Sequence, residues 1–351
     1  MEKRRESLIK AFQEVGKAMI LFANQSGYDS FNKLMDESLY DRMMTEIETA
    51  HRYNGWFTPE SVRNALLELG QLLTEEKLSN WTKEYEFSTS PKSVGVVMAG
   101  NIPLVGFHDF LCVIFSGNKA IVKLSSDDNR IFPILLEIIT LYYPEIFSYV
   151  NIQPQLKEID AVIATGSDNS ARYFEKYFER VPHIIRRNRT SLAVLNGTET
   201  KEELYQLGKD IFMYFGLGCR NVSKIFIPQD FDLNRLFEAI LPYNEIIHHH
   251  KYANNYDYYK AVYLMNKHQI IENGFLLTME SEELFAPIGV LLITRYNHQD
   301  EVEQYLDEHK SQIQVIVGKD YIPFGEAQSP RLNDYADGVN TMQFLDQINK
   351  K

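Results

Sequence analysis

Residues 93–100, SVGVVMAG, form an apolar run that ends in glycine, and this pattern predicts a buried strand. A helical pattern follows over residues 104–117, and NKAIVKLS (118–125) predicts a second strand. A helix over 131–141 then leads to a third strand, IDAVIATG (159–166). Strands that alternate with helices form a parallel, doubly wound sheet, and such sheets bind ligands at the carboxyl ends of their strands.

The rest of the chain divides into a helical region and a second α/β block. Residues 1–85 carry apolar side chains at spacings of three and four, which predicts helices. The second block begins near SLAVLNG (191–197) and continues through a helix, a turn and several strands. The helix is expected over 199–214 and the turn over 215–219, with strands over 222–228, 287–296 and 313–318.

Composition excludes several classes of protein. The formal charge of −12 gives no general affinity for phosphate backbones, so no nucleic-acid partner is expected. No run approaches the roughly 18 apolar residues that would span a membrane. Near the N-terminus, Glu6, Gln13 and Lys17 interrupt the apolar residues at helical spacing, which indicates an amphipathic helix and no signal peptide. Two cysteines make no disulfide framework and suit a reducing compartment, the cytoplasm.

Cys219 is the sharpest chemical feature. It lies in a Gly-x-Gly-Cys-Arg turn, whose small residues let a substrate approach the sulfur. Arg220 and the amides of the turn would favour the thiolate, which is the nucleophilic form. An inert thiol in a tight turn fits this local sequence equally well. Cys112, in the apolar run DFLCVIF, is expected in the core.

Four further polar features are candidates for binding a ligand or a metal ion. Gly166 permits a tight turn and Ser167 can cap the next helix, whose amides suit a phosphate, although an ordinary capped helix is the simpler explanation. Asn101 could donate to an oxyanion, but a turn asparagine more often caps the local backbone. Lys123 ends its strand at the expected ligand edge. The run His248–His250 lacks spaced partners, so no metal site is expected.

The order of these motifs resembles the aldehyde dehydrogenase superfamily. There, a Pro-rich Asn turn, a Lys-Pro-Ser segment, a Phe-Thr-Gly-Ser turn and a Gly-Gln-x-Cys turn follow one another. GNIP, VKLSS, TGS and GLGC stand in the same order in this chain, and EELFAP (282–287) and the segment 323–345 look like the later Glu-Ile-Phe-Gly-Pro and Pro-Phe-Gly-Gly segments. The resemblance covers residues 90–345 or so.

This resemblance implies an α/β, aldehyde-dehydrogenase-like fold with two doubly wound domains. A cofactor-binding domain would span 1–187, with 1–85 as an N-terminal helical layer. A catalytic domain carrying Cys219 would span 188–322, and a tail over 323–351 would return across the cleft between the domains. The resemblance also implies a homodimer.

One departure from the superfamily narrows the activity. Hydrolytic members carry a glutamate before the first strand of the catalytic domain, where it activates the water that cleaves the acyl-enzyme. Here the corresponding stretch is RRNRTSLAV, and no carboxylate lies between Arg186 and Asn196. An acyl-enzyme should therefore persist. With GNIPLVGFHDF and RNVSKIF, the chain looks most like the acyl-CoA reductase family, which includes the LuxC fatty-acid reductase of bacterial bioluminescence.

The resemblance implies NADPH-dependent reduction of an acyl-CoA or acyl-protein thioester to an aldehyde. Cys219 would form the acyl-enzyme, and the side-chain amide of Asn101 would hold the oxyanion. An aldehyde dehydrogenase that oxidises free aldehydes stays an alternative, against which the missing glutamate argues. A non-redox thiol acyltransferase or thioesterase would share the cysteine and need no nicotinamide. A catalytically inactive binding or scaffold protein is the third alternative, against which the presence of the cysteine, the asparagine and the Gly-Ser turn together argues.

The cofactor residues follow from the same resemblance. Ser167, beside Gly166, would contact the pyrophosphate, Lys123 the adenosine ribose and Glu283 the nicotinamide ribose. Relatives that prefer NAD often carry an acidic residue three places after the lysine. Ser126 stands there in this chain, and a serine does not repel a 2′-phosphate, so NADP(H) is the expected cofactor.

Overall fold

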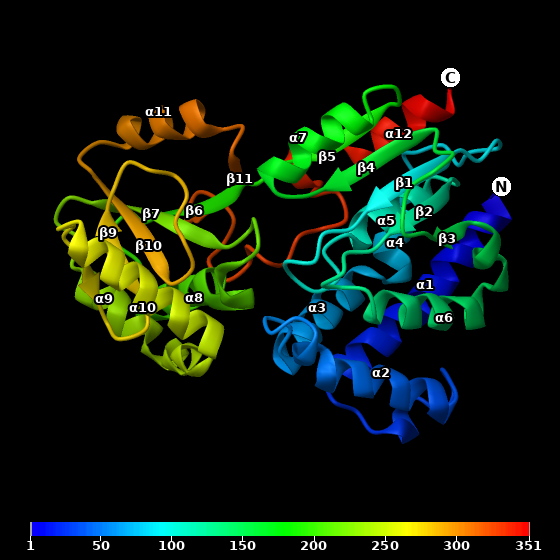
Figure 1. Cartoon of the computed structure of the whole chain (residues 1–351), viewed down its shortest axis with the longest axis horizontal. Helices are drawn as coiled ribbons and strands as arrows, with labels where there is room; N and C mark the ends of the chain where they lie inside the picture. The colour runs from blue at the N-terminus through cyan, green and yellow to red at the C-terminus, as the bar shows by residue number, and fades with distance from the viewer. Residues whose placement is uncertain (1, 351) are drawn as a thin grey trace. The chain divides into compact units, whose positions relative to one another are not determined.

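The computed structural model describes residues 2–350 and divides into two compact units (Figure 1). Unit 1 contains the chain up to Arg187 and again from Arg331 onward, and unit 2 contains Asn188–Pro330. The cofactor-binding and catalytic roles expected of the two domains stay predictions.

Unit 1 begins with four α-helices, so the helical N-terminal region is confirmed. They are α1 (Glu2–Ala23), α2 (Glu37–Thr49), α3 (Pro59–Leu72) and α4 (Glu75–Thr82). The side chains of Asp36, Thr58 and Thr74 cap α2, α3 and α4 by accepting a backbone N–H in the first turn.

Helix α1 packs closely on α3, and two glycines permit the contact. A Cβ at Gly16 would lie 2.7 Å from Cβ of Leu73, and a Cβ at Gly70 would lie 2.9 Å from the carbonyl oxygen of Gly16. The apolar face of α1, from Leu8 to Phe22, is buried in the main core of unit 1. The expected amphipathic helix is therefore present.

A five-stranded parallel sheet forms the centre of unit 1. Its strands are β1 (Ser93–Val97), β2 (Lys119–Lys123), β3 (Val150–Ile152), β4 (Ala161–Thr165) and β5 (His183–Arg186), in the order β3-β2-β1-β4-β5. The apolar runs predict β1, β2 and β4. The short edge strands β3 and β5 carry exposed residues, and their weak apolar signal explains why they were not predicted.

Alternating residues of the unit 1 sheet face two different cores. Val94 and Val96 join the large core that also contains α1, α5 (Phe107–Phe115) and α6 (Ile131–Tyr142). Val97 faces the other way and packs with Phe174 of α7 (Asp168–Tyr177). Helices thus cover both faces, as a doubly wound sheet requires.

Unit 2 is built around a six-stranded sheet in the order β11-β6-β7-β10-β9-β8. Its strands are β6 (Thr190–Val194), β7 (Val222–Pro228), β8 (Ile271–Glu272), β9 (Leu277–Glu280), β10 (Val290–Tyr296) and β11 (Ile313–Gly318), and only β8 pairs antiparallel among the described strands. The helices are α8 (Lys201–Phe212), α9 (Leu233–Ile240), α10 (His250–Met265) and α11 (Gln299–His309). Helices α8 and α9 share one core with the sheet and α11 another, so this sheet is also doubly wound (Figure 1).

The end of the chain returns to unit 1 as α12 (Thr341–Asn349), which lies against α5. Its apolar residues Met342, Leu345 and Ile348 enter the main core. The sequence predicts no helix in this tail, because the nine residues of α12 are too few to show a helical period.

A buried ion pair joins three parts of unit 1. Arg186, at the end of β5, is 3% exposed and pairs with Asp109 of α5 through Nη2–Oδ1 (2.7 Å) and Nε–Oδ2 (3.2 Å). Its guanidinium also donates to the carbonyl oxygen of Ala336 (2.6 Å) and to Oγ1 of Thr341 (2.9 Å). Arg186 therefore connects the C-terminal segment, at Ala336 and Thr341, to α5 and to strand β5 of the sheet.

Arg186→Met should lower the free energy of unfolding by about 3–5 kcal/mol, because it leaves Asp109 buried without its charge partner. Urea denaturation of the purified variant measures the loss. The matched control is Arg42→Met, which breaks an exposed two-bond pair with Glu137 and should cost less than about 1 kcal/mol. Equal losses in the two variants would contradict this account of the buried pair.

Candidate active site

Cys219 lies in a turn between the 3₁₀ segment η4 (Met213–Gly216) and β7, where the sequence places it, and its side chain is partly exposed. Oγ of Ser191, on the neighbouring strand β6, donates to the carbonyl oxygen of Cys219 (2.9 Å). Cys112 is fully buried, and burial raises the pKa of its thiol well above the usual range. The two cysteines thus differ as expected in their accessibility.

Asn221 holds the Cys219 turn from inside, and sequence reasoning missed it. Its Oδ1 accepts the backbone N–H of Gly218 (2.8 Å), and its Nδ2 donates to the carbonyl oxygens of Asp210 (3.1 Å) and Met213 (2.6 Å). One buried amide thus connects the end of α8 to the Cys219 turn. The available signal was a polar residue directly before a mainly apolar strand.

The backbone just before the turn is strained. Tyr214 (φ 53°), Phe215 (φ 59°) and Gly216 (φ 80°) are three consecutive residues in the left-handed region. Non-glycine residues reach this conformation only at an energetic cost, and such strain is frequent near active sites. The rigid contacts of Asn221 on both sides explain how the segment persists.

A second connection fastens the PFGEAQ segment, residues 323–328, to the same turn. The carboxylate of Asp210 accepts the backbone N–H groups of Gly325 (2.6 Å) and Ala327 (3.0 Å), while Nε of Arg220 donates to the carbonyl oxygen of Ala327. Asp210 has no exposed surface, and burial raises its pKa to about 6. The end of α8, the Cys219 turn and the PFGEAQ segment therefore form one connected structure.

Asn101 is exposed in the turn that follows β1. This turn packs against the turn that follows β2. A Cβ at Gly100 would lie 2.6 Å from Oγ of Ser125, so only glycine permits this approach. The carboxylate of Asp128 accepts the backbone N–H of Leu104 (2.7 Å), and burial raises the pKa of Asp128 to about 6.

The other cofactor candidates of unit 1 lie at the same sheet edge. Lys123 is the last residue of β2 and is paired in register with Val97 of β1; Ser126 follows in the exposed turn. Gly166 and Ser167 follow β4, and Oγ of Ser167 accepts the N–H of Ser170 as the cap of α7 (3.4 Å). Strands β2 and β3 lie on one side of β1, and β4 and β5 lie on the other side. The strand order therefore switches between β1 and β4, and in parallel sheets ligands bind beside such a switch point.

Glu283 lies in unit 2 in the segment that follows β9, and its side chain is exposed. The structure therefore places Asn101, Lys123, Ser126, Gly166 and Ser167 in unit 1 and Cys219 and Glu283 in unit 2. Their catalytic and cofactor-binding roles stay predictions.

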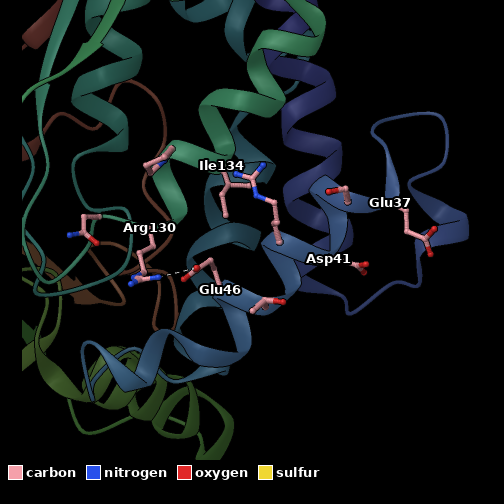
Figure 2. A pocket seen from close by; sticks show the side chains of 10 residues that line it. Glu37, Asp41, Glu46, Arg130 and Ile134 are labelled. Carbon is pink, nitrogen blue, oxygen red and sulfur yellow. Dashed lines mark hydrogen bonds and ion pairs between the residues drawn. The ribbon is translucent and has the colours of Figure 1, made fainter.

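A surface pocket of about 680 Å³ lies elsewhere in unit 1, between α2 and the start of α6 (Figure 2). None of the candidate site residues lines it. Arg130 pairs there with Glu46 (3.2 Å), and Arg42 pairs with Glu137. Because carboxylates already neutralise both arginines, the pocket has no evident affinity for an anionic cofactor.

Residues 2–350, which the structure describes, contain no group of three or more His, Cys, Asp or Glu side chains placed to hold a metal ion. None of their helices combines the length and apolar character needed to cross a membrane.

Solved structures similar to this chain are aldehyde dehydrogenases. Aldehyde dehydrogenase 21 from Physcomitrella patens has a TM-score of 0.62 at 12% identity and covers 99% of this chain and 88% of its own. An indole-3-acetaldehyde dehydrogenase from P. syringae, solved with NAD⁺, has a TM-score of 0.58 at 13% identity and covers 90% of this chain and 75% of its own. The chain therefore has the aldehyde dehydrogenase fold.

The family within that superfamily is also shown. A family model described as acyl-CoA reductase (LuxC) matches residues 21–240, which is more than half of the chain. This chain belongs to the acyl-CoA reductase (LuxC) family.

Two curated relatives carry the same name, long-chain acyl-protein thioester reductase. The protein of Aliivibrio fischeri is 26% identical over 205 residues, which are 53% of this chain and 42% of the relative. The protein of Vibrio harveyi is 24% identical over 249 residues, which are 62% of this chain and 51% of the relative. The chain thus matches about half the length of these relatives.

The buried Asp210 gives the site a pH-dependent stability. The pKa of Asp210 is about 6 in the folded state, above the usual value of about 3.9 that applies in the unfolded state. Between about pH 4 and 6, Asp210 is therefore protonated in the folded state and ionised in the unfolded state. The contribution of Asp210 to stability therefore falls as pH rises through this window. Relative to wild type, Asp210→Asn should gain roughly 1–3 kcal/mol between pH 4 and 7.

Urea denaturation of both proteins at several pH values measures this difference. Asp230→Asn, which changes an exposed carboxylate of the same unit, is the control. A stability difference between wild type and Asp210→Asn that stays constant from pH 4 to 7 would contradict the assignment.

Proposed function

We propose that this chain reduces an acyl thioester to an aldehyde through an acyl-enzyme on Cys219, with NADPH as the hydride donor. The observation that carries the proposal is the partly exposed Cys219, in a turn held by Asn221, Ser191 and Arg220, within a member of the acyl-CoA reductase family. The names of the two curated relatives support a long-chain acyl thioester as the substrate.

The first half of the reaction needs only residues of this chain. The Cys219 thiolate attacks the thioester carbonyl, a new carbon–sulfur bond forms, and the bond to the donor thiol breaks. The side-chain amide of Asn101 and the backbone N–H of Cys219 donate to the oxyanion in this step. After hydride addition, the sulfur of Cys219 leaves as the thiolate and the aldehyde is released.

The environment of Arg186 supports a long-lived acyl-enzyme. Arg186 stands near the place where hydrolytic relatives carry their water-activating glutamate, and it is buried in its pair with Asp109. A buried cation cannot take a proton from water. Thioester reduction is therefore favoured over the oxidation of free aldehydes.

The carboxyl edge of the unit 1 sheet fits a nicotinamide dinucleotide, which supplies hydride when bound. Ser167 and the first amides of α7 would hold the pyrophosphate, beside the small residue Gly166. Lys123 and Ser126 would hold the adenosine ribose, and Glu283 the nicotinamide ribose. The NAD⁺ complex of the structurally similar indole-3-acetaldehyde dehydrogenase supports this class of cofactor.

Two observations favour NADPH over NADH. Ser126 is exposed and carries no charge, so its own side chain does not repel a 2′-phosphate; its hydroxyl donates to the carboxylate of the exposed Asp127 (3.5 Å), which would turn outward when the phosphate binds. Asp128, two residues further on, is buried and accepts the N–H of Leu104, which directs its carboxylate away from solvent. The cytoplasm, where NADPH is available and the two free cysteines stay reduced, is the proposed location.

The proposal is tested with purified protein, a long-chain acyl-CoA and NADPH. Aldehyde should form with wild type, and Cys219→Ala should abolish it.

Asn101→Ala should slow acylation by roughly 100- to 1000-fold, because an oxyanion donor is lost, and should change NADPH affinity little. Asn151→Ala, on the exposed edge strand β3, is the control. Full aldehyde formation by Cys219→Ala would refute the proposed function.

Ser126→Glu should shift the cofactor preference toward NADH, because a carboxylate repels the 2′-phosphate. Titration of both cofactors by fluorescence, at low and high salt, measures the preference. The NADPH advantage of wild type should shrink as salt rises. If Ser126→Glu leaves the ratio of the two affinities unchanged, Ser126 does not face the adenosine ribose.

A further inference from the structure

Lys224 lies in the middle of β7, five residues after Cys219, and has no exposed surface. We propose that Lys224 is a positioning residue that fixes the Glu283 segment, residues 281–286, for the nicotinamide half of the cofactor. This inference rests on the proposed function and assigns a separate task to a residue that the reaction itself does not use.

The ammonium of Lys224 is directed at backbone carbonyl groups of that segment. Nζ donates to the carbonyl oxygens of Ser281 (2.6 Å) and Glu283 (3.0 Å). The carbonyl between them, that of Glu282, accepts the hydroxyl of Tyr305 on α11 (2.9 Å). Oγ1 of Thr294 on β10 also donates to the carbonyl oxygen of Ser281 (2.9 Å). Three successive carbonyl groups are therefore held by three side chains from other elements, and that of Glu283 is held by Lys224.

The remaining surroundings of the ammonium are aromatic. Nζ lies 5.4 Å from the ring centroid of Phe226 and 5.0 Å from that of Tyr305. The nearby charged groups are the carboxylates of Glu282 and Glu283, both on exposed residues. The ammonium of Lys224 thus donates its hydrogen bonds to carbonyl groups of the segment.

Burying a lysine here is costly, so its presence requires a reason. An ammonium inside a protein loses its hydration, and burial lowers the pKa of Lys224 to about 8. An apolar residue would pack in the middle of a strand without that cost. What an apolar residue cannot do is donate to two carbonyl groups at once, and these donations fix the path of the chain at Glu283.

Lys224 and the Cys219 turn are held by different contacts, so loss of Lys224 can be distinguished from damage to the nucleophile. The Cys219 turn is held by Asn221, Ser191 and Arg220, and none of these contacts involves Lys224. Loss of Lys224 should therefore spare acylation of Cys219 and weaken the half-reaction that needs the cofactor.

Lys224→Met, similar in length and without charge, tests the proposal through the two half-reactions. Acylation by a long-chain acyl-CoA without cofactor, followed by intact mass, should stay within about threefold of wild type. The Kd for NADPH should rise, or reduction of the preformed acyl-enzyme should slow, by about tenfold or more. Lys319→Met, a partly exposed lysine of unit 2, is the control and should match wild type in both assays.

Tyr305→Phe provides a second, milder variant in case Lys224→Met folds poorly. It removes only the hydroxyl that holds the carbonyl of Glu282, and should weaken the cofactor half-reaction by about threefold while acylation is unchanged. Equal losses in both half-reactions would show general structural support and would overturn the proposal. No loss in either half-reaction would also overturn it.

Hydrogen exchange separates failure of this proposal from failure of the proposed function. Amide groups of residues 281–286 should exchange faster in Lys224→Met than in wild type, whatever the activity. If wild type forms no acyl-enzyme but exchange in this segment responds, the proposed function fails and the structural role of Lys224 stands. Unchanged exchange would refute the role of Lys224 on its own.

Discussion

The side-chain amide of Asn221 is the interaction on which the candidate active site depends. A nucleophilic cysteine must be accessible, and a turn that exposes it loses the regular hydrogen bonds of a helix or a strand. Asn221 replaces them, because it bonds the end of α8 on one side and the N–H of Gly218 on the other. Ser191 and Arg220 extend the same arrangement to β6 and to the segment around Ala327. The strained residues Tyr214 and Phe215 are held between these fixed points.

The buried pair of Arg186 and Asp109 connects architecture with chemistry. Where the resemblance to hydrolytic aldehyde dehydrogenases would place a carboxylate that activates water, this chain has Arg186, a cation that is neutralised inside unit 1. Arg186 offers no base there and instead contacts the C-terminal segment through Ala336 and Thr341. An acyl-enzyme protected from hydrolysis is the chemical consequence that we propose.

Much of the fold could be predicted because buried parallel strands are continuous apolar runs. SVGVV and IDAVIAT show this pattern, whereas the exposed edge strand β3 does not, and α12 is too short to show its period. Cys219 and Ser167 could be predicted as site residues because their turns resemble known motifs. Asn221 and Lys224 were missed because their partners, Met213 and Ser281, are defined only once the chain has folded. A polar residue in an apolar strand has no meaning in sequence until its acceptors are known.

The central claim is that Cys219 carries a stable acyl thioester. Incubation with a long-chain acyl-CoA without nicotinamide, followed by digestion and peptide mass spectrometry, tests it directly. The account predicts one acyl group, attached to Cys219, that persists over the incubation and disappears when NADPH is added. An acyl group on another residue, or rapid release as the free acid without NADPH, would contradict the account.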